Sequence, residues 1–131
     1  MKWYQNPDLG LLLVRIALGL VFIVHGWQKV SNLTGTVGFF GSIGLPAFLA
    51  YVVAAIEFLG GLAILLGIWT RVVGVLLAAV MVGAIVTLKF KAGFSGGYEF
   101  DLTLLLIALA MSFSGPGRYA ISRSGLKSAQ A

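Results

Sequence analysis

Hydrophobic residues fill four long stretches of the chain, and polar residues are concentrated in the segments between them. The apolar runs are Leu9–Val30, Ala47–Ile68, Val72–Leu88 and Phe100–Phe113. A helix that crosses a bilayer needs about 20 mostly apolar residues. The first two runs reach that length, and the last two reach it when flanking residues are included. The pattern predicts an all-α integral membrane protein that folds as a bundle of four transmembrane helices.

The connections between the runs indicate how the helices are joined. The loop at residues 31–46 is long for a helix connection, and its apolar spacing predicts a short helix that lies at the membrane interface. A tight turn at Trp69–Arg71 makes the second and third spans antiparallel neighbours. Gly115-Pro116-Gly117 is expected to end the fourth helix. We predict one membrane domain at residues 1–121 and a flexible polar tail at residues 122–131.

Composition and charge support this prediction and suggest an orientation. Of the 131 residues, 60% are hydrophobic and 10% are charged, whereas soluble domains average about 25% charged residues. Five basic residues flank the side of the termini and three flank the other side, so the positive-inside rule places both termini in the cytoplasm. The net charge of +5 is attributed to this topology and to anionic lipids, and nucleic acid is not expected as a partner. The lack of cysteine excludes iron–sulfur clusters held by this chain alone.

Glu57, near the middle of the second run, is the clearest sign of chemistry within the membrane. Insertion of an acidic side chain at the centre of a span is costly, and for Asp the free-energy cost is roughly 2.5–3.5 kcal/mol. Glu57 should therefore face other helices and take a partner or a proton. Arg15 in the first run is the expected partner, because antiparallel spans centred on the same plane put Glu57 between the levels of Arg15 and His25. The pair either fixes the helix register or belongs to a proton or ligand site.

Helical periodicity groups these charges with small residues. One arc of about 80° around the axis of the first helix carries Arg15, Gly19, Phe22, Gly26 and Lys29, and His25 lies just beside this arc. One face of the second helix carries Ala50, Ala54, Glu57 and Gly61, flanked by Gly60. Glycines on facing helices allow close backbone contact. We expect both faces to point into the bundle.

A second polar group is expected at the membrane face opposite the termini. It contains His25, Lys29, Lys89, Lys91, Tyr98, Glu99 and Asp101. These residues should meet where amphiphilic ligands enter the membrane. Simpler roles remain open, because acids stabilise a helix start, lysines extend to the interface, and His25 could be an ordinary hydrogen-bonded histidine. No metal site is expected, because no second histidine or cysteine completes a ligand shell.

Taken in order, these residues resemble the DoxX family of small four-helix bacterial and archaeal membrane proteins. The resemblance extends from about Leu9 to Tyr119. It rests on the motifs Arg15-x3-Gly19-x2-Phe22-x3-Gly26-x2-Lys29, Gly44-x-Pro46, Glu57-x2-Gly60-Gly61, Gly67-x2-Thr70-Arg71, Gly97-x-Glu99 and Gly115-Pro116-Gly117-Arg118. A serine and an aspartate often follow the last motif in the family, whereas this chain continues Tyr119-Ala120-Ile121.

The resemblance implies a multi-pass protein of the bacterial or archaeal cytoplasmic membrane. Such proteins are associated with membrane oxidoreductase assemblies, with detoxification of quinones, catechols or oxidants, and with resistance to redox stress. The family residues that this chain carries at matching places are Arg15, Lys29, Glu57 and Glu99. The resemblance does not decide whether the chain is itself an enzyme.

Our first functional hypothesis is a membrane subunit of a quinone-linked oxidoreductase or detoxification system, with a quinone as the candidate cofactor. The catalytic candidates are Glu57, Glu99 and His25, and the ligand-binding candidates are Arg15, Lys29, Tyr98 and Asp101. In this hypothesis His25 or Tyr98 hydrogen-bonds a carbonyl oxygen, Glu57 or Glu99 exchanges a proton, and the charge of Arg15 tunes Glu57.

Two further hypotheses assign the intramembrane charges to other roles. In the second, the bundle is a non-catalytic anchor or scaffold for a soluble or membrane oxidoreductase, and its charges fix helix register. In the third, it is a pathway for a small solute or for protons. All three place the chain in the lipid bilayer, and packing of its glycines also makes a homodimer a candidate assembly.

Overall fold

The computed structural model describes residues 2–122, and these residues are helical or lie in turns and loops, with no strand among them. The long helices are α1 (Pro7–Val30), α3 (Ala47–Leu66), α4 (Thr70–Ala84) and α5 (Glu99–Ser114), and the short helix α2 (Leu33–Ser42) lies in the first loop. Between α4 and α5 come the π-helical turn η1 (Ile85–Lys89), the 3₁₀ turn η2 (Phe90–Ala92) and the π-helical turn η3 (Phe94–Tyr98).

Four helical segments are long and apolar enough to cross a membrane, as the sequence predicts. They are Pro7–Val30, Ala47–Leu66, Thr70–Ala92 and Phe94–Ser114. The third and fourth reach this length because η1 and η2 extend α4, and η3 extends α5 toward its N-terminus. The predicted helix in the first loop is present as α2, while its position at the membrane interface stays a prediction. Most of the predicted tail, residues 123–131, lies outside the described residues.

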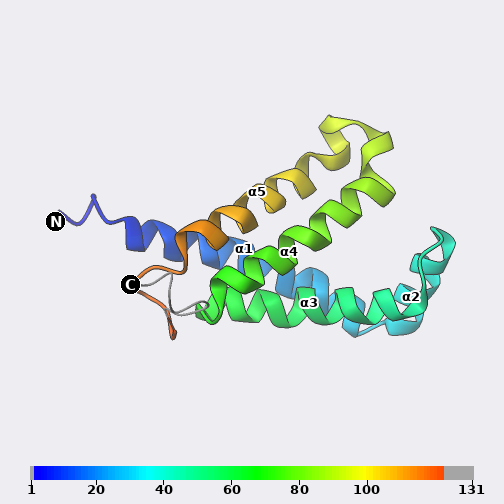
Figure 1. Ribbon diagram of the computed structural model, residues 1–131, viewed down its shortest axis with the longest axis horizontal. Helices are drawn as coiled ribbons and strands as arrows, with labels where there is room; N and C mark the ends of the chain where they lie inside the picture. The colour runs from blue at the N-terminus through cyan, green and yellow to red at the C-terminus, as the bar shows by residue number, and fades with distance from the viewer. Residues whose placement is uncertain (1, 123–131) are drawn as a thin grey trace.

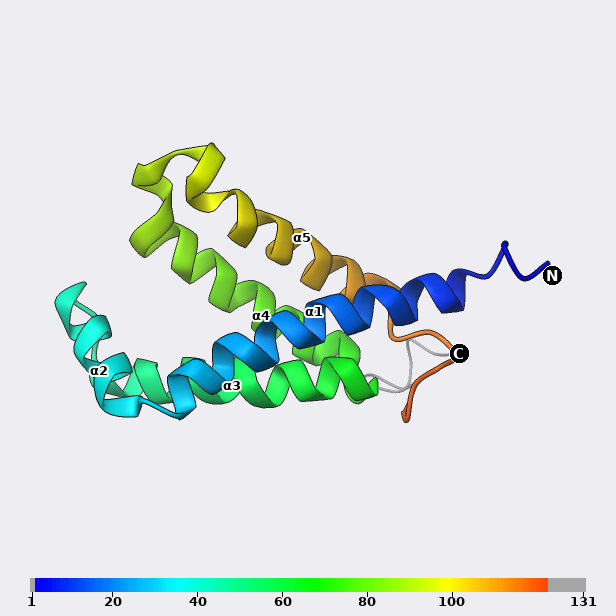
Figure 2. The ribbon, with the colours of Figure 1, turned by 180° about the vertical axis from the view of Figure 1, so that it is seen from behind.

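The long helices form two antiparallel pairs that diverge from one end of the molecule. Helix α1 packs along α3, and α4 packs along α5. The pairs meet near the α3–α4 turn and separate toward α2 and the η turns, as Figure 1 and the reverse view in Figure 2 show. The described chain begins and ends at the closed end, where the Asn6 side-chain amide donates to the Tyr119 hydroxyl at 3.2 Å. The bundle is therefore closed at one end and open at the other.

Glycines bring the backbones of α1 and α3 into contact. A Cβ at Gly26 would overlap the backbone nitrogen of Phe58, and one at Gly61 would lie 2.7 Å from the backbone nitrogen of Ile23. Real Cβ atoms do not come this close, so neither position accepts a larger residue without movement of a helix. The inward-facing glycines predicted for the first two spans are confirmed, and they fix the sliding position of one helix along the other.

The helix ends follow local chemistry. Helix α1 begins after Asn6, whose side-chain oxygen accepts the backbone N–H of Leu9, with a proline in the first turn. Helix α3 ends at Gly67, which adopts a left-handed conformation with φ of 74°. Helix α5 ends before the predicted Gly-Pro-Gly break.

The hydrophobic core lies where the two helix pairs meet. Its buried members are Leu18, Phe22, Ile64, Leu77, Ala78, Met81, Leu104, Ala108 and Met111. They come from all four long helices, so burial of these side chains joins the pairs. The core does not extend to the open end, where a cavity separates the two pairs.

Candidate functional site

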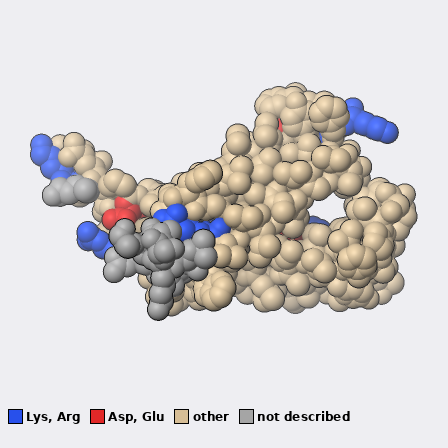
Figure 3. All heavy atoms as spheres, in the orientation of Figure 1, with Lys and Arg blue, Asp and Glu red and all other residues tan. Residues whose placement is uncertain are grey.

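A cavity of about 510 Å³ occupies the space between the diverging helix pairs. All four long helices, α2 and η1 contribute to its walls. Figure 3 shows the hollow between the α2 end of the molecule and the arm that carries the η turns. Most of the lining is apolar, and the titratable side chains in it are His25, Lys29, Glu57, Lys89 and Asp101. Five residues of the predicted polar groups therefore share one cavity.

Lys29 and Glu57 form an ion pair on the α1–α3 wall of this cavity. The Lys29 ammonium donates to Glu57 Oε1 at 2.7 Å, and the Glu57 side chain is only 5% exposed. A bond between two charged groups at this distance is a strong one. The last turn of α1 supplies the lysine, and the packing of Gly26 against Glu57 and Phe58 brings the two helices to the same level.

Arg15 is not the partner of Glu57, and the predicted Arg15–Glu57 pair is wrong. The Arg15 side chain is buried, with 1% of the residue exposed. Its guanidinium donates to backbone carbonyl oxygens of Ile64 (3.0 Å), Leu65 (2.8 Å), Pro116 (3.2 Å) and Tyr119 (2.6 Å). Arg15 therefore ties the C-terminus of α3 to the loop after α5, and it does not line the cavity. The charge of Arg15 is not placed to tune Glu57.

The physical reason is the register between α1 and α3. The prediction centred both spans on one plane, which places Glu57 level with residue 20. The glycine contacts instead place it beside Gly26, six residues, or ~9 Å, further along α1. Arg15 then meets the last turn of α3, whose carbonyl oxygens lack helical donors and attract a cation.

The acidic residues at the start of α5 lie in different surroundings. Asp101 lines the cavity and is 7% exposed, and within the described part of the chain its carboxylate has no hydrogen-bond or ion-pair partner. Glu99 is not among the residues that line the cavity. Its backbone carbonyl accepts the Thr103 hydroxyl at 2.8 Å. Of these two sequence candidates, the structure brings only Asp101 to the ion pair's cavity.

Tyr98 belongs to a second, apolar surface. Its ring stacks on Phe90 with centroids 5.9 Å apart and meets Phe94 edge-on at 5.5 Å. Tyr98 lines a separate groove of about 290 Å³ between α4 and α5. The predicted polar cluster is therefore divided, because Tyr98 and Glu99 lie outside the cavity that His25, Lys29 and Asp101 line.

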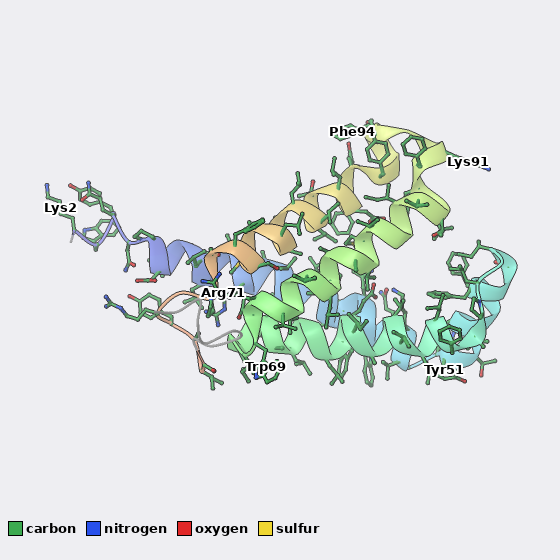
Figure 4. The ribbon with its side chains drawn as sticks, viewed as in Figure 1. Lys2, Tyr51, Trp69, Arg71, Lys91 and Phe94 are labelled. Carbon is green, nitrogen blue, oxygen red and sulfur yellow. The ribbon has the colours of Figure 1, made fainter. Side chains whose placement is uncertain are left out.

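The two lysines near the end of the third span lie in different surroundings. Lys89 lines the cavity, whereas Lys91 does not and extends away from the molecule in Figure 4. In a regular helix Lys91 would share the face of Ala84, since seven residues make two turns. The π-helical turn η1, closed by a bond from the Phe90 N–H to the Ile85 oxygen, adds one residue to the turn. As a result Lys89, and not Lys91, lies on the same face as Ala84 and lines the cavity.

Aromatic residues of the cavity are the part that sequence reasoning missed. Phe39 and Phe40 of α2 face it, as does Phe100, whose ring centroid lies 6.1 Å from that of His25. The apolar spacing of α2 gave a signal for a buried face but not for what that face would cover. Lys29 itself had a signal, because it follows Gly26 by about one turn on the inward face of α1, but its pairing with Glu57 depends on the register between the two helices.

The fold and the buried charges define a multi-pass helical membrane protein. The family model described as DoxX matches residues 10–89, and the chain belongs to the DoxX family. No solved structure matches it.

Curated relatives place this family in bacterial membranes. The chain is 50% identical to "Putative oxidoreductase CatD" of Bacillus subtilis (strain 168), over 85% of this chain and 83% of the relative. It is 33% identical to "Inner membrane protein YqjF" of Escherichia coli (strain K12), over 88% and 92%. It is 36% identical to "Uncharacterized membrane protein Rv3486" of Mycobacterium tuberculosis (strain ATCC 25618 / H37Rv), over 93% and 85%. The chain is accordingly a multi-pass bacterial membrane protein, as predicted.

Proposed function

We propose that the protein binds a quinone or a small phenolic compound in the cavity between the helix pairs. In this role it is the membrane subunit of a quinone-linked oxidoreductase or of a redox-stress or detoxification system. The observation that carries the proposal is one apolar cavity, open at one end of the bundle. It contains both the Lys29–Glu57 ion pair and Asp101, whose carboxylate has no partner among residues 2–122.

The size and lining of the cavity support a flat, apolar ligand. Small-molecule sites measure roughly 300–1,000 Å³ and combine apolar walls with a few polar groups, and this cavity of about 510 Å³ lies within that range. Phe22, Phe40 and Phe100 offer aromatic surfaces to a ring. The charged groups then favour a ring that carries oxygen atoms, because an unsubstituted hydrocarbon would form no hydrogen bond with Asp101 or with the remaining N–H groups of Lys29.

The chemistry of quinones also suits the titratable groups. Reduction of a quinone takes up electrons and protons together, and carboxylates and histidine are common proton donors and acceptors. Glu57, Asp101 and His25 line the cavity and can serve in this way, whereas Glu99 and Tyr98 would have to act from outside it. Electrons would come from a partner protein or a bound cofactor. The name of the relative from Bacillus subtilis, an oxidoreductase, agrees with this assignment.

A steric block tests the proposal without altering any charge. Ala79 lines the cavity on α4, while Val75, one turn away on the same helix, is 55% exposed and does not line it. With the protein in lipid nanodiscs, we expect Ala79→Phe to weaken binding of a short-chain quinone at least about tenfold, because a phenyl ring removes part of the space that the ligand needs. Val75→Phe should bind as the unaltered protein does.

Equal binding by the Ala79→Phe variant would contradict the proposed site. Failure of the unaltered protein to bind any quinone or phenol, together with recovery of an oxidoreductase in a pull-down, would favour the non-catalytic scaffold instead.

A further inference from the structure

The charged residues of the cavity form two groups on opposite walls. The first pole is Lys29 and Glu57, on the α1–α3 pair. The second pole is Lys89 and Asp101, at the end of η1 and in the first turn of α5. The first pole belongs to the α1–α3 pair and the second to the α4–α5 pair with its η1 extension. Because these helix pairs diverge toward this end of the molecule (Figure 1), the two poles lie on the two sides of the cavity.

Each pole combines one ammonium, which only donates hydrogen bonds, with one carboxylate, which only accepts them. At the first pole the two groups bond to each other through one oxygen of Glu57. Lysine has three N–H donors, so this pole keeps donors and an acceptor for a ligand. At the second pole Lys89 and Asp101 line the same cavity without forming an ion pair within the described chain.

Asp101 makes the second pole incomplete. It is 7% exposed, and no described residue donates a hydrogen bond to its carboxylate. Its oxygens are not among the fully buried atoms that lack a partner, so they are open to the cavity. A ligand that fills the cavity takes this carboxylate out of water, which is costly unless a donor reaches it. A ligand that brings a hydroxyl group to Asp101 removes this cost, and the hydroxyl oxygen can at the same time accept a bond from Lys89.

From this arrangement we propose that the cavity recognises an aromatic ring with hydroxyl groups at opposite ends, a 1,4-dihydroxy aromatic compound. One hydroxyl binds at each pole. The inference rests on the proposed function and narrows its ligand class. A hydroxyl both donates and accepts, so it satisfies a carboxylate and an ammonium together. A quinone carbonyl only accepts and leaves Asp101 without a donor, so the cavity prefers the reduced, dihydroxy form over the quinone.

Ligand isomers test the proposal directly. Binding to the protein in nanodiscs would be measured by calorimetry under anaerobic conditions. The ligands are 1,4-dihydroxynaphthalene, 4-methoxy-1-naphthol, 1,2-dihydroxynaphthalene and 1,4-naphthoquinone. We expect the 1,4-diol to bind at least about tenfold more tightly than each of the others, the loss expected when a charged group gives up one hydrogen bond. Equal binding of the diol and its mono-methyl ether would overturn the two-pole proposal while leaving the proposed function intact. No binding by any of the four would instead contradict the proposed function.

Substitutions at the second pole give an independent test. The readout is the ratio of affinities for 1,4-dihydroxynaphthalene and 1-naphthol, which general destabilisation of the bundle does not change. Asp101→Asn and Lys89→Gln should each reduce this ratio toward one. Lys91→Gln, two residues from Lys89 but outside the cavity, should keep it. An unchanged ratio in both Asp101→Asn and Lys89→Gln would contradict the proposal.

Discussion

At the scale of single residues, Arg15 shows how a buried charge can be satisfied without an opposite charge. Its guanidinium bonds to four backbone carbonyl oxygens, two at the end of α3 and two in the loop after α5. The last carbonyls of a helix carry partial negative charge and lack helical donors. The Ile64 oxygen also accepts the Gly67 N–H at 3.2 Å, and Arg15 adds further donors and a favourable charge. These contacts hold the closed end of the bundle together.

Replacement of Arg15 should destabilise the fold. Arg15→Met leaves the four carbonyl oxygens without this donor, and we expect a loss of about 3 kcal/mol or more, measured by thermal unfolding in detergent. Arg118 is the matched control, because its side chain is 73% exposed and lies 3.9 Å from Asp8. Arg118→Met should change stability by less than about 0.5 kcal/mol. Similar unfolding temperatures for the two variants would show that the carbonyl contacts of Arg15 contribute little.

At the scale of helices, close backbone packing sets which residues of α1 and α3 meet. Gly19 and Gly26 face Gly61 and the Glu57–Phe58 backbone, so α1 cannot slide along α3 without a clash. This register brings Lys29 to Glu57 and sends Arg15 to the end of α3. The position of the ion pair is thus a consequence of where the glycines lie.

Two glycines of α1 allow this packing to be tested. A Cβ at Gly26 would overlap the Phe58 backbone, whereas one at Gly10 would meet nothing within 4 Å. We expect Gly26→Ala to destabilise the protein by about 1–3 kcal/mol through overpacking. Gly10→Ala should be neutral or should stabilise it by up to about 1 kcal/mol, because alanine favours the helix. Thermal unfolding distinguishes them, and a tolerated Gly26→Ala would mean that the helices pack less tightly than described.

The sequence predicts a feature well when the interactions that determine it lie within one helix, and poorly when they lie between helices. The spans and their buried glycine faces could be predicted, because hydrophobicity and a period of about 3.6 residues act within one helix. The Lys29–Glu57 pair could not, because the register depends on contacts between α1 and α3. Lys89 lines the cavity in place of Lys91 because of the π-helical turn η1, and the periodicity of a regular helix does not predict such a turn.

At the scale of the whole molecule, the two helix pairs form a bundle that is closed at one end and open at the other. The closed end holds the core and the Arg15 contacts, and the open end holds the cavity and its charges. The contacts that stabilise the bundle and the proposed ligand site are thereby separated along the length of the helices. A ligand can occupy the open end without disturbing the contacts that join the two pairs.

The predicted orientation places the closed end in the cytoplasm. The chain contains no cysteine, so a single introduced cysteine reports its own location. With a maleimide that does not cross membranes, we expect Lys91→Cys to be labelled in intact cells and Arg118→Cys to be labelled only after the cells are opened. The reverse labelling would contradict the predicted orientation and place the cavity's open end on the cytoplasmic side.

The measurement that tests the central claim most directly is an experimental structure of the protein in lipid with 1,4-dihydroxynaphthalene bound. The account predicts a ring between the two helix pairs, with one hydroxyl at the Lys29–Glu57 ion pair and the other at Asp101. A ligand bound elsewhere, or a cavity filled by side chains after the pairs close on each other, would contradict it.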